Sequence, residues 1–311
     1  MEITSAWIEA QWPLSAVRVG ERFGSREAYA ISASEGEFVL KVTGEWTSRA
    51  DVDRTTGIPA FLRAKGLDCA PPVLPARTGE AYQSLGERFA YLMQSVPGTK
   101  LPATPPGYRR LGKVAAALHA LTDYPGECPL SAVELRPQML KAASRFPFAA
   151  EYAVLIESLP PLERDGLPVG LIHPDLHPDH VIVRPDLPAP SVARQAGLPA
   201  PNVARQAGGT IVLVDWDESG TGIRILDVGQ PLISTFVTEN LVFLREEARA
   251  FYAAYCETIT LTSPERDLIF PAALFFALWY LPMGGSASAR WERIKYAMRR
   301  RDELLTVIPP P

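Results

Sequence analysis

The sequence is poor in cysteine and histidine, with 3 cysteines and 4 histidines among its 311 residues. The cysteines are Cys69, Cys128 and Cys256, which lie far apart and include no C-x-x-C pair. Disulfide frameworks and zinc ribbons need cysteines that are paired at short spacing, so neither is expected. This cysteine usage fits a reducing cytosol.

The sequence also lacks a long uninterrupted apolar run. Its most apolar stretch, residues 268–283, is short for a membrane span and contains Pro271 and Pro282, so we expect a buried helix there. The N-terminal stretch MEITSAWIEAQWPL contains acids and no apolar core, so it is not expected to be a signal peptide. Together these features predict a cytoplasmic protein without a membrane partner.

No strong excess of either charge is present, because 31 basic and 35 acidic residues leave a formal net charge of −4. This balance argues against a nucleic-acid partner and favours neutral or cationic small molecules. Hydrophobic residues make up 47% of the chain and charged residues 21%, which is ordinary for a folded protein. The length allows one large or two modest domains, and the composition does not indicate an oligomeric state.

The first part of the chain is rich in predicted strands. Residues 16–43 alternate apolar and polar side chains between turn residues, which predicts three antiparallel strands. Residues 48–66 predict a helix that stops at Gly66, and residues 88–98 predict a strand that runs into a turn.

The rest of the chain is mainly helical in pattern, with apolar residues at helical spacing. One predicted helix is expected to start with Ser263 as the N-cap and Pro264 at the first helical position. The predicted helices cover residues 108–121, 131–159, 241–258, 264–281 and 287–307. We therefore expect an α+β fold with an N-terminal lobe of residues 1–95 and a C-terminal lobe of residues 96–311.

Two copies of an eleven-residue repeat follow each other directly. LPAPSVARQAG, residues 187–197, differs from LPAPNVARQAG, residues 198–208, at one position. Solenoids need longer units and more of them, so this is not a solenoid. A duplication inside an inserted surface loop, residues 186–209, is the better interpretation, since loop closure entropy grows slowly with length.

Three of the four histidines lie within the segment LIHPDLHPDHVIV, residues 171–183. The histidines are His173, His177 and His180, and Asp175 and Asp179 alternate with them. The segment begins and ends with apolar, strand-like residues and has a polar, proline-containing centre. This pattern predicts a functional loop held between two short strands.

A second acidic segment, TIVLVDWDESG, reads as a buried strand that ends in Asp215 and Asp217. A carboxylate at the end of a buried strand is rigidly held and suits a divalent cation. Upstream, Lys41 interrupts the apolar strand FVLKV. A strand lysine in a chain with such carboxylates is a candidate phosphate ligand. His119, on an apolar helix face, is expected to be structural.

The combination of H-P-D-L-H-P-D-H-V, V-D-W-D and F-V-L-K-V resembles the aminoglycoside phosphotransferase superfamily. This superfamily includes aminoglycoside, macrolide, choline and homoserine kinases, and it shares the two-lobed protein-kinase-like fold. The resemblance implies an ATP-dependent kinase that transfers the γ-phosphate to a hydroxyl of a small molecule, with ATP and Mg²⁺ as cofactors.

The resemblance also implies roles for residues of the catalytic loop and the phosphate site. Asp175 matches the catalytic aspartate that accepts or orients the substrate hydroxyl proton, and His173 matches the residue that orients the loop. Asp215 matches the Mg²⁺ ligand, and Lys41 matches the lysine on the α- and β-phosphates. Asp227 matches a structural aspartate.

The connector YLMQSVPG matches the segment whose backbone pairs with adenine, which implies that Gln94, Ser95 and Val96 bind the nucleotide. Two features depart from the family pattern. His180 occupies the place of the usual asparagine, the second metal ligand, and imidazole suits Mn²⁺ better than Mg²⁺. The helix that should present a glutamate to Lys41 has Arg54-Thr55-Thr56 instead, which leaves Asp51 or Asp53 as candidates.

Two alternatives remain open for the function. A nucleotide-binding pseudokinase would bind ATP without turnover. A zinc-dependent hydrolase would use His173, His177 and His180 with an aspartate, but their spacing does not match zinc motifs on helices or strands, and Lys41 would have no role. Asp217 also has two open roles, one behind the metal site and one facing the substrate.

Overall fold

The computed structural model describes residues 3–24, 27–162, 166–185, 209–283 and 286–310. By their packing, residues Met1–Lys100 and Val181–Asp217 form one compact unit, and Leu101–His180 with Glu218–Pro311 form the other. The predicted lobe boundary after residue 95 stays a prediction. The eleven-residue repeats lie outside the described residues.

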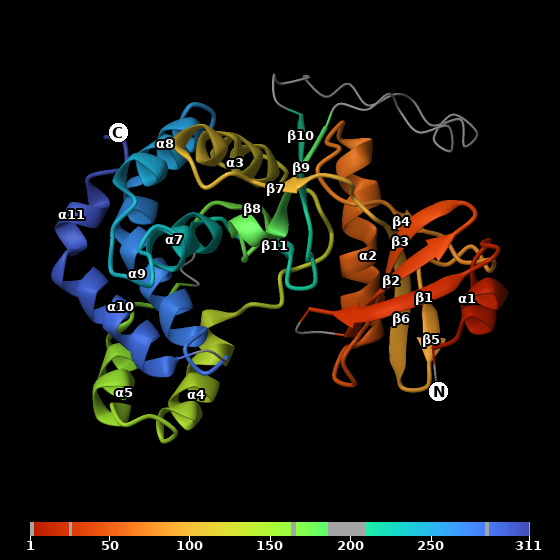
Figure 1. Ribbon diagram of the computed structural model, residues 1–311. Helices are drawn as coiled ribbons and strands as arrows, with labels where there is room; N and C mark the ends of the chain where they lie inside the picture. The colour runs from red at the N-terminus through yellow and green to blue at the C-terminus, as the bar shows by residue number, and fades with distance from the viewer. Residues whose placement is uncertain (1–2, 25–26, 163–165, 186–208, 284–285, 311) are drawn as a thin grey trace. The chain divides into compact units, whose positions relative to one another are not determined.

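The N-terminal unit contains an antiparallel sheet in the order β1-β2-β3-β6-β4, with β5 also paired to β6 (Figure 1). The strands are β1 Arg18–Phe23, β2 Glu27–Ala33, β3 Gly36–Val42, β4 Val73–Leu74, β5 Gln83–Leu85 and β6 Arg88–Gln94. The predictions of three antiparallel strands in residues 16–43 and of a strand in residues 88–98 are confirmed.

One face of this sheet carries a hydrophobic core. Strand β3 buries alternate residues, Phe38, Leu40 and Val42, because successive side chains of a strand point to opposite faces. Ile8 and Trp12, from helix α1 (Ser5–Gln11) and its C-cap, belong to the same core cluster. The sequence analysis did not predict α1.

Helix α2, Arg49–Ala64, packs against residues of the opposite face. Its Val52 clusters with Tyr82 and Tyr91. Tyr91 of β6 lies directly opposite Lys41 of β3 in the antiparallel register, so both side chains are on this face. The helix starts with a capping box and lies within the predicted range of residues 48–66.

A smaller sheet in the same unit has the order β10-β9-β7. Its strands are β7 Thr99–Lys100, β9 Val181–Arg184 and β10 Thr210–Leu213. Arg184 and Thr210 are register partners, so the predicted strands on either side of the inserted loop pair with each other. The turn before β7 needs Gly98, since an added Cβ would overlap the Val183 carbonyl.

The C-terminal unit is mainly helical (Figure 1). Its helices are α3 Pro105–His119, α4 Ala132–Ala143, α5 Ala149–Ser158, α7 Ile225–Ser234, α8 Arg245–Cys256, α9 Ser263–Trp279, α10 Ala287–Arg299 and α11 Arg301–Leu305. Helix α3 packs along α8, and α7 packs along α9. Strands β8 Val169–Ile172 and β11 Gly220–Ile223 pair antiparallel, and a 3-10 turn covers Pro178–His180.

The structure corrects several helix boundaries. The N-cap of α9 is Thr262, not Ser263, because Thr262 and Glu265 form a reciprocal capping box. The predicted helix of residues 131–159 is divided into α4 and α5 by a segment that contains Pro147. The last predicted helix is interrupted at Arg300, which ends α10 and caps α11.

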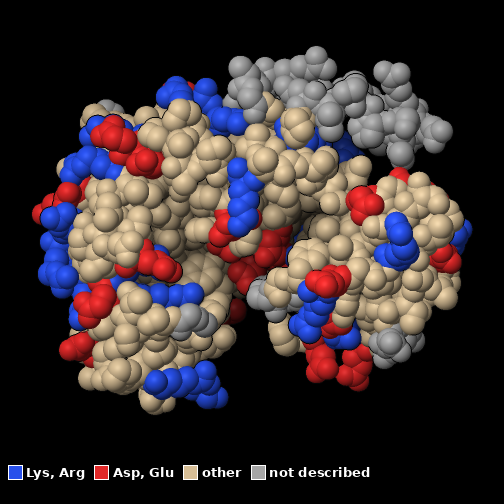
Figure 2. All heavy atoms as spheres, in the orientation of Figure 1, with Lys and Arg blue, Asp and Glu red and all other residues tan. Residues whose placement is uncertain are grey.

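The apolar run of residues 268–283 lies largely in α9, most of whose residues are buried, as predicted. Among the described residues, none of the helices combines the length and the apolar character that crossing a membrane requires. On the face seen in Figure 2, acidic and basic side chains occur in small groups of both signs on each unit.

Candidate active site

The predicted catalytic-loop segment, residues 171–180 of the C-terminal unit, is anchored by a buried polar network. Asp227, in the first turn of α7, is fully buried, and its Oδ2 accepts the backbone N–H of His173 at 2.7 Å. The same oxygen lies 2.9 Å from Nε2 of His119 at the end of α3, and His119 Nδ1 lies 2.9 Å from the Tyr255 hydroxyl of α8. The start of the loop is thus tied to three helices, and His119 is structural, as expected.

Asp175 and His180 contact each other within this segment. His180 Nδ1 lies 3.1 Å from Asp175 Oδ2, and both side chains are about one-third exposed or less. Burial would raise the pKa of Asp175, but the hydrogen bond and charge of His180, with charges from the other two histidines, lower it. Asp175 is therefore an ionised carboxylate, which can accept or orient a proton. Metal binding by His180 stays a prediction.

The other histidine of the segment pairs with a different acid. His177 Nδ1 lies 3.4 Å from Asp179 Oδ2, so His177 and His180 each contact an aspartate of their own. In the part of the chain that the structure describes, no group of three or more His, Cys, Asp or Glu side chains is arranged to hold a metal ion.

Lys41 in the N-terminal unit forms two short ion pairs. Its Nζ lies 2.7 Å from Asp215 Oδ1 and 2.9 Å from Asp217 Oδ2. Asp215 follows β10 with φ of 67°, a left-handed conformation that is uncommon for any residue except glycine. The strand lysine and the strand-end carboxylates, 174 residues apart in the case of Asp215, therefore meet as one cluster.

The expectation that Asp51 or Asp53 pairs with Lys41 is wrong. The Asp51 carboxylate accepts hydrogen bonds from the backbone and side chain of Ser48 in the capping box of α2. Asp53 accepts the hydroxyl of Tyr82 at 2.8 Å. Asp51 therefore stabilises the start of the helix, and Asp53 binds a tyrosine that precedes β5.

Two residues that the sequence analysis missed hold Asp217. The Tyr91 hydroxyl donates to Asp217 Oδ1 at 2.7 Å, and Arg54 Nη2 donates to the Asp217 carbonyl at 2.9 Å. Burial and the nearby Asp217 raise the pKa of Tyr91 well above its ordinary value, so it is a neutral donor. Burial works against the charge of Lys41, but the carboxylates of Asp217 and Asp215 raise its pKa. A tyrosine inside an apolar strand was the available sequence signal.

The connector residues make backbone hydrogen bonds inside the N-terminal unit. Gln94 N–H donates to the Pro72 carbonyl, and Ser95 N–H donates to the Glu37 carbonyl, both at 2.9 Å. Among the backbone hydrogen bonds of the described residues, no such partner is found for the Val96 N–H. Nucleotide binding by Gln94, Ser95 and Val96 stays a prediction.

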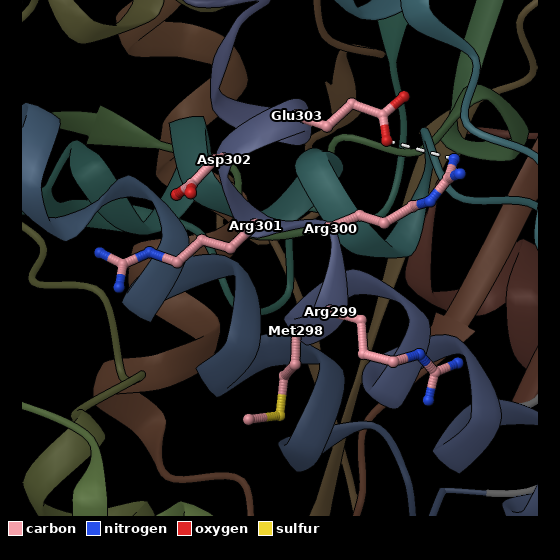
Figure 3. A pocket seen from close by; sticks show the side chains of 6 residues that line it. All are labelled: Met298, Arg299, Arg300, Arg301, Asp302 and Glu303. Carbon is pink, nitrogen blue, oxygen red and sulfur yellow. Dashed lines mark ion pairs between the residues drawn. The ribbon is translucent and has the colours of Figure 1, made fainter.

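A hollow of about 360 Å³ lies at the junction of α10 and α11 (Figure 3). It is lined by one continuous segment, residues 298–303, and includes none of the predicted site residues. Its three arginines are exposed. Arg300 pairs with Glu303 at 3.2 Å, and the Arg301 guanidinium lies 5.5 Å from the centre of the Phe270 ring.

Comparison with known families identifies the class of protein. The family described as the phosphotransferase enzyme family matches residues 16–189, which is more than half of the chain. The chain therefore belongs to this family, and the predicted resemblance is confirmed. The matched region includes Lys41, the connector and the catalytic-loop segment, and it ends before Asp215.

The chain is also similar to curated homoserine kinases. It is 30% identical over 162 residues to the enzyme of Mesorhizobium japonicum, which covers 49% of this chain and 50% of the relative. It is 31% identical over 168 residues to the enzyme of Methylobacterium radiotolerans, which covers 49% of this chain and 50% of the relative. The chain spans about half the length of the curated relatives it matches.

Solved structures resemble the chain over nearly its whole length. The amicoumacin kinase hAmiN, in complex with AMP-PNP, Ca²⁺ and Ami, has a TM-score of 0.66 at 14% identity and covers 98% of this chain and 94% of its own. A microcompartment-associated aminopropanol kinase has a TM-score of 0.61 at 16% identity, with coverages of 94% and 95%. These likenesses show the fold and confirm the predicted protein-kinase-like α+β class.

Proposed function

We propose that this protein transfers the γ-phosphate of ATP to a hydroxyl group of a small molecule. The observation that carries the proposal is the Lys41–Asp215 ion pair at 2.7 Å. It joins a lysine in the middle of a sheet to a strand-end carboxylate, the two groups that phosphoryl transfer requires for phosphate and metal binding. The ionised Asp175 supports the same function.

Each residue has a definable task in this reaction. The ammonium of Lys41 neutralises phosphate oxygens as a compact positive charge. The Asp175 carboxylate accepts or orients the proton of the acceptor hydroxyl, and its lowered pKa keeps it ionised at neutral pH. Catalysis then rests mainly on positioning and charge neutralisation, because phosphoryl transfer needs little covalent help from the protein.

The chain offers an oxygen ligand that fits a hard divalent cation. The Asp215 side chain is 38% exposed, lies at the end of a rigid strand and provides carboxylate oxygens. Asp215 would hold Mg²⁺, which supplies charge neutralisation on the phosphates when it is bound. His180 would be a second ligand by resemblance, and an imidazole nitrogen there favours Mn²⁺ over Mg²⁺.

The acceptor is proposed to be a small hydroxyl compound such as homoserine, an aminoglycoside, a macrolide or choline. Homoserine is the first of these to test, because the curated relatives that match the chain are homoserine kinases. The match covers only about half of each relative's length, so the other acceptors belong in the same experiment.

The test is a screen of these acceptors for ATP consumption and for the phosphorylated product, with wild-type protein and the Asp175→Asn variant. We expect turnover with one acceptor class, a loss of about 10²-fold or more in the variant, and nearly unchanged Mg-ATP affinity. Asp179→Asn, in the same segment, is the matched control. Mg-ATP binding without turnover on any acceptor would favour the pseudokinase, and absence of Mg-ATP binding would overturn the proposal.

A further inference from the structure

The acids of helix α2 do not supply the carboxylate that pairs with Lys41. The capping box occupies Asp51, and the Tyr82 hydroxyl occupies Asp53. Near the place where the family pattern presents a glutamate, this chain has Arg54-Thr55-Thr56, and Arg54 is buried and donates to the carbonyl of Asp217. Helix α2 therefore contributes to the Lys41 cluster through the guanidinium of Arg54, which binds the main-chain carbonyl of Asp217.

Asp217 is held at both carboxylate oxygens and at its backbone. Oδ2 accepts from Lys41 at 2.9 Å, Oδ1 accepts from the Tyr91 hydroxyl at 2.7 Å, and the carbonyl accepts from Arg54 at 2.9 Å. Since Tyr91 is fixed opposite Lys41 by the register of β3 and β6, its hydroxyl and the ammonium flank the carboxylate from neighbouring strands. This arrangement fixes the direction of the Lys41 side chain.

The two acids of the V-D-W-D segment differ in their surroundings. The Asp215 side chain is 38% exposed, whereas that of Asp217 is 19% exposed and bonds to the buried Tyr91. The more exposed acid is the one to which the proposed function gives the cation. The less exposed acid, Asp217, is bonded to Tyr91 of the sheet and to Arg54 of α2, which suits a carboxylate that stays paired with Lys41.

We propose that Asp217, held by Tyr91 and Arg54, is the positioning residue for Lys41 and takes the place of the helix glutamate that this chain lacks. The inference rests on the proposed function, in which Lys41 binds the nucleotide phosphates. The sequence left two roles open for Asp217, one behind the metal site and one facing the substrate. The proposed role differs from both, because the carboxylate acts through Lys41.

The test is a double-mutant cycle of Asp217→Asn and Lys41→Met. It measures kcat with the acceptor found in the screen, and Mg-ATP affinity by calorimetry. We expect Asp217→Asn to lower kcat by about 10- to 100-fold, the scale of misplacement effects. In the Lys41→Met background the same substitution should change kcat and affinity by no more than about twofold, because the proposal has Asp217 act through Lys41. Asp217→Glu should restore part of the lost kcat.

The matched control is Asp53→Asn, which removes a carboxylate that also accepts a tyrosine hydroxyl in this unit but does not contact Lys41. It should leave kcat within about twofold of wild type. Tyr91→Phe should lower kcat in the same direction as Asp217→Asn, by a smaller factor.

Two results would overturn the positioning role. One is an equal loss of kcat from Asp217→Asn with and without Lys41, which would mean a general structural effect. The other is a raised Mg²⁺ requirement in Asp217→Asn at saturating ATP, which would make Asp217 a metal ligand. If wild-type protein failed to bind Mg-ATP at all, the proposed function itself would fail, and that result is seen before any variant is made.

Discussion

Replacing Asp227 by alanine tests whether the buried network of the C-terminal unit holds the catalytic-loop segment. Asp227 is fully buried and accepts from the His173 N–H and from His119. Its removal leaves two buried groups without their acceptor, and each such group costs about 1–3 kcal/mol. Relief of the buried carboxylate's desolvation offsets part of this cost. We therefore expect the free energy of unfolding to fall by about 2–5 kcal/mol.

The assay is equilibrium unfolding in urea, followed by tryptophan fluorescence and circular dichroism. Asp267→Ala is the control, because Asp267 is an exposed acid of α9 and its loss should change stability by no more than about 0.5 kcal/mol. A double-mutant cycle of Asp227→Ala and His119→Ala should show a coupling free energy of about 1 kcal/mol or more between Asp227 and His119. A loss below about 1 kcal/mol for Asp227→Ala would refute the reasoning, because two unsatisfied donors in a rigid site cannot cost so little.

Two further predictions concern stability. Burial would raise the pKa of Glu265, but hydrogen bonds from Arg224 and Thr262 lower it. The contribution of Glu265 to the free energy of unfolding is therefore present above the unfolded-state pKa, near 4.3, and is lost as pH falls through the lower folded-state pKa. Glu265→Gln should therefore cost about 1.5–3 kcal/mol at pH 7, and its difference from wild type in urea unfolding should shrink below about pH 4.3; a constant difference down to pH 3 would contradict this. Gly112→Ala should lower the melting temperature although alanine favours helices by about 1 kcal/mol, because its Cβ would overlap the Phe251 carbonyl where α3 packs on α8, and an unchanged or higher melting temperature would contradict it.

Periodicity predicted the elements that have one buried face. Strand β3 alternates buried and less buried residues, and α3 presents an apolar stripe to α8, so both patterns were visible in the sequence. Helix α7 was missed because it is only ten residues long and contains Gly229 and Pro231, which both disfavour a helix interior. Helix α1 was missed because seven residues are too few for a periodic pattern.

The motifs identified Lys41, Asp175 and Asp215, but they did not identify what each of them contacts. The partner of Lys41 depends on the register of β3 against β6 and on the turn after β10, in which Asp215 adopts φ of 67°. Neither feature has a local sequence signature. The family pattern of a helix glutamate therefore made Asp51 and Asp53 the candidates, whereas the structure pairs Lys41 with Asp215 and Asp217.

The division of the chain into compact units bears on how the Lys41 cluster is maintained. The predicted boundary assigned Asp215 and Asp217 to the C-terminal lobe, together with Asp175. By packing, the segment Val181–Asp217 belongs with residues 1–100, because β9 pairs with β7 and the Leu213 N–H donates to the Cys69 carbonyl. The ion pairs of Lys41 are therefore contacts within one compact unit. Their geometry is set by its strand pairing and by the contacts of Arg54 and Tyr91, so a substitution confined to the C-terminal unit should leave the Lys41 cluster in place.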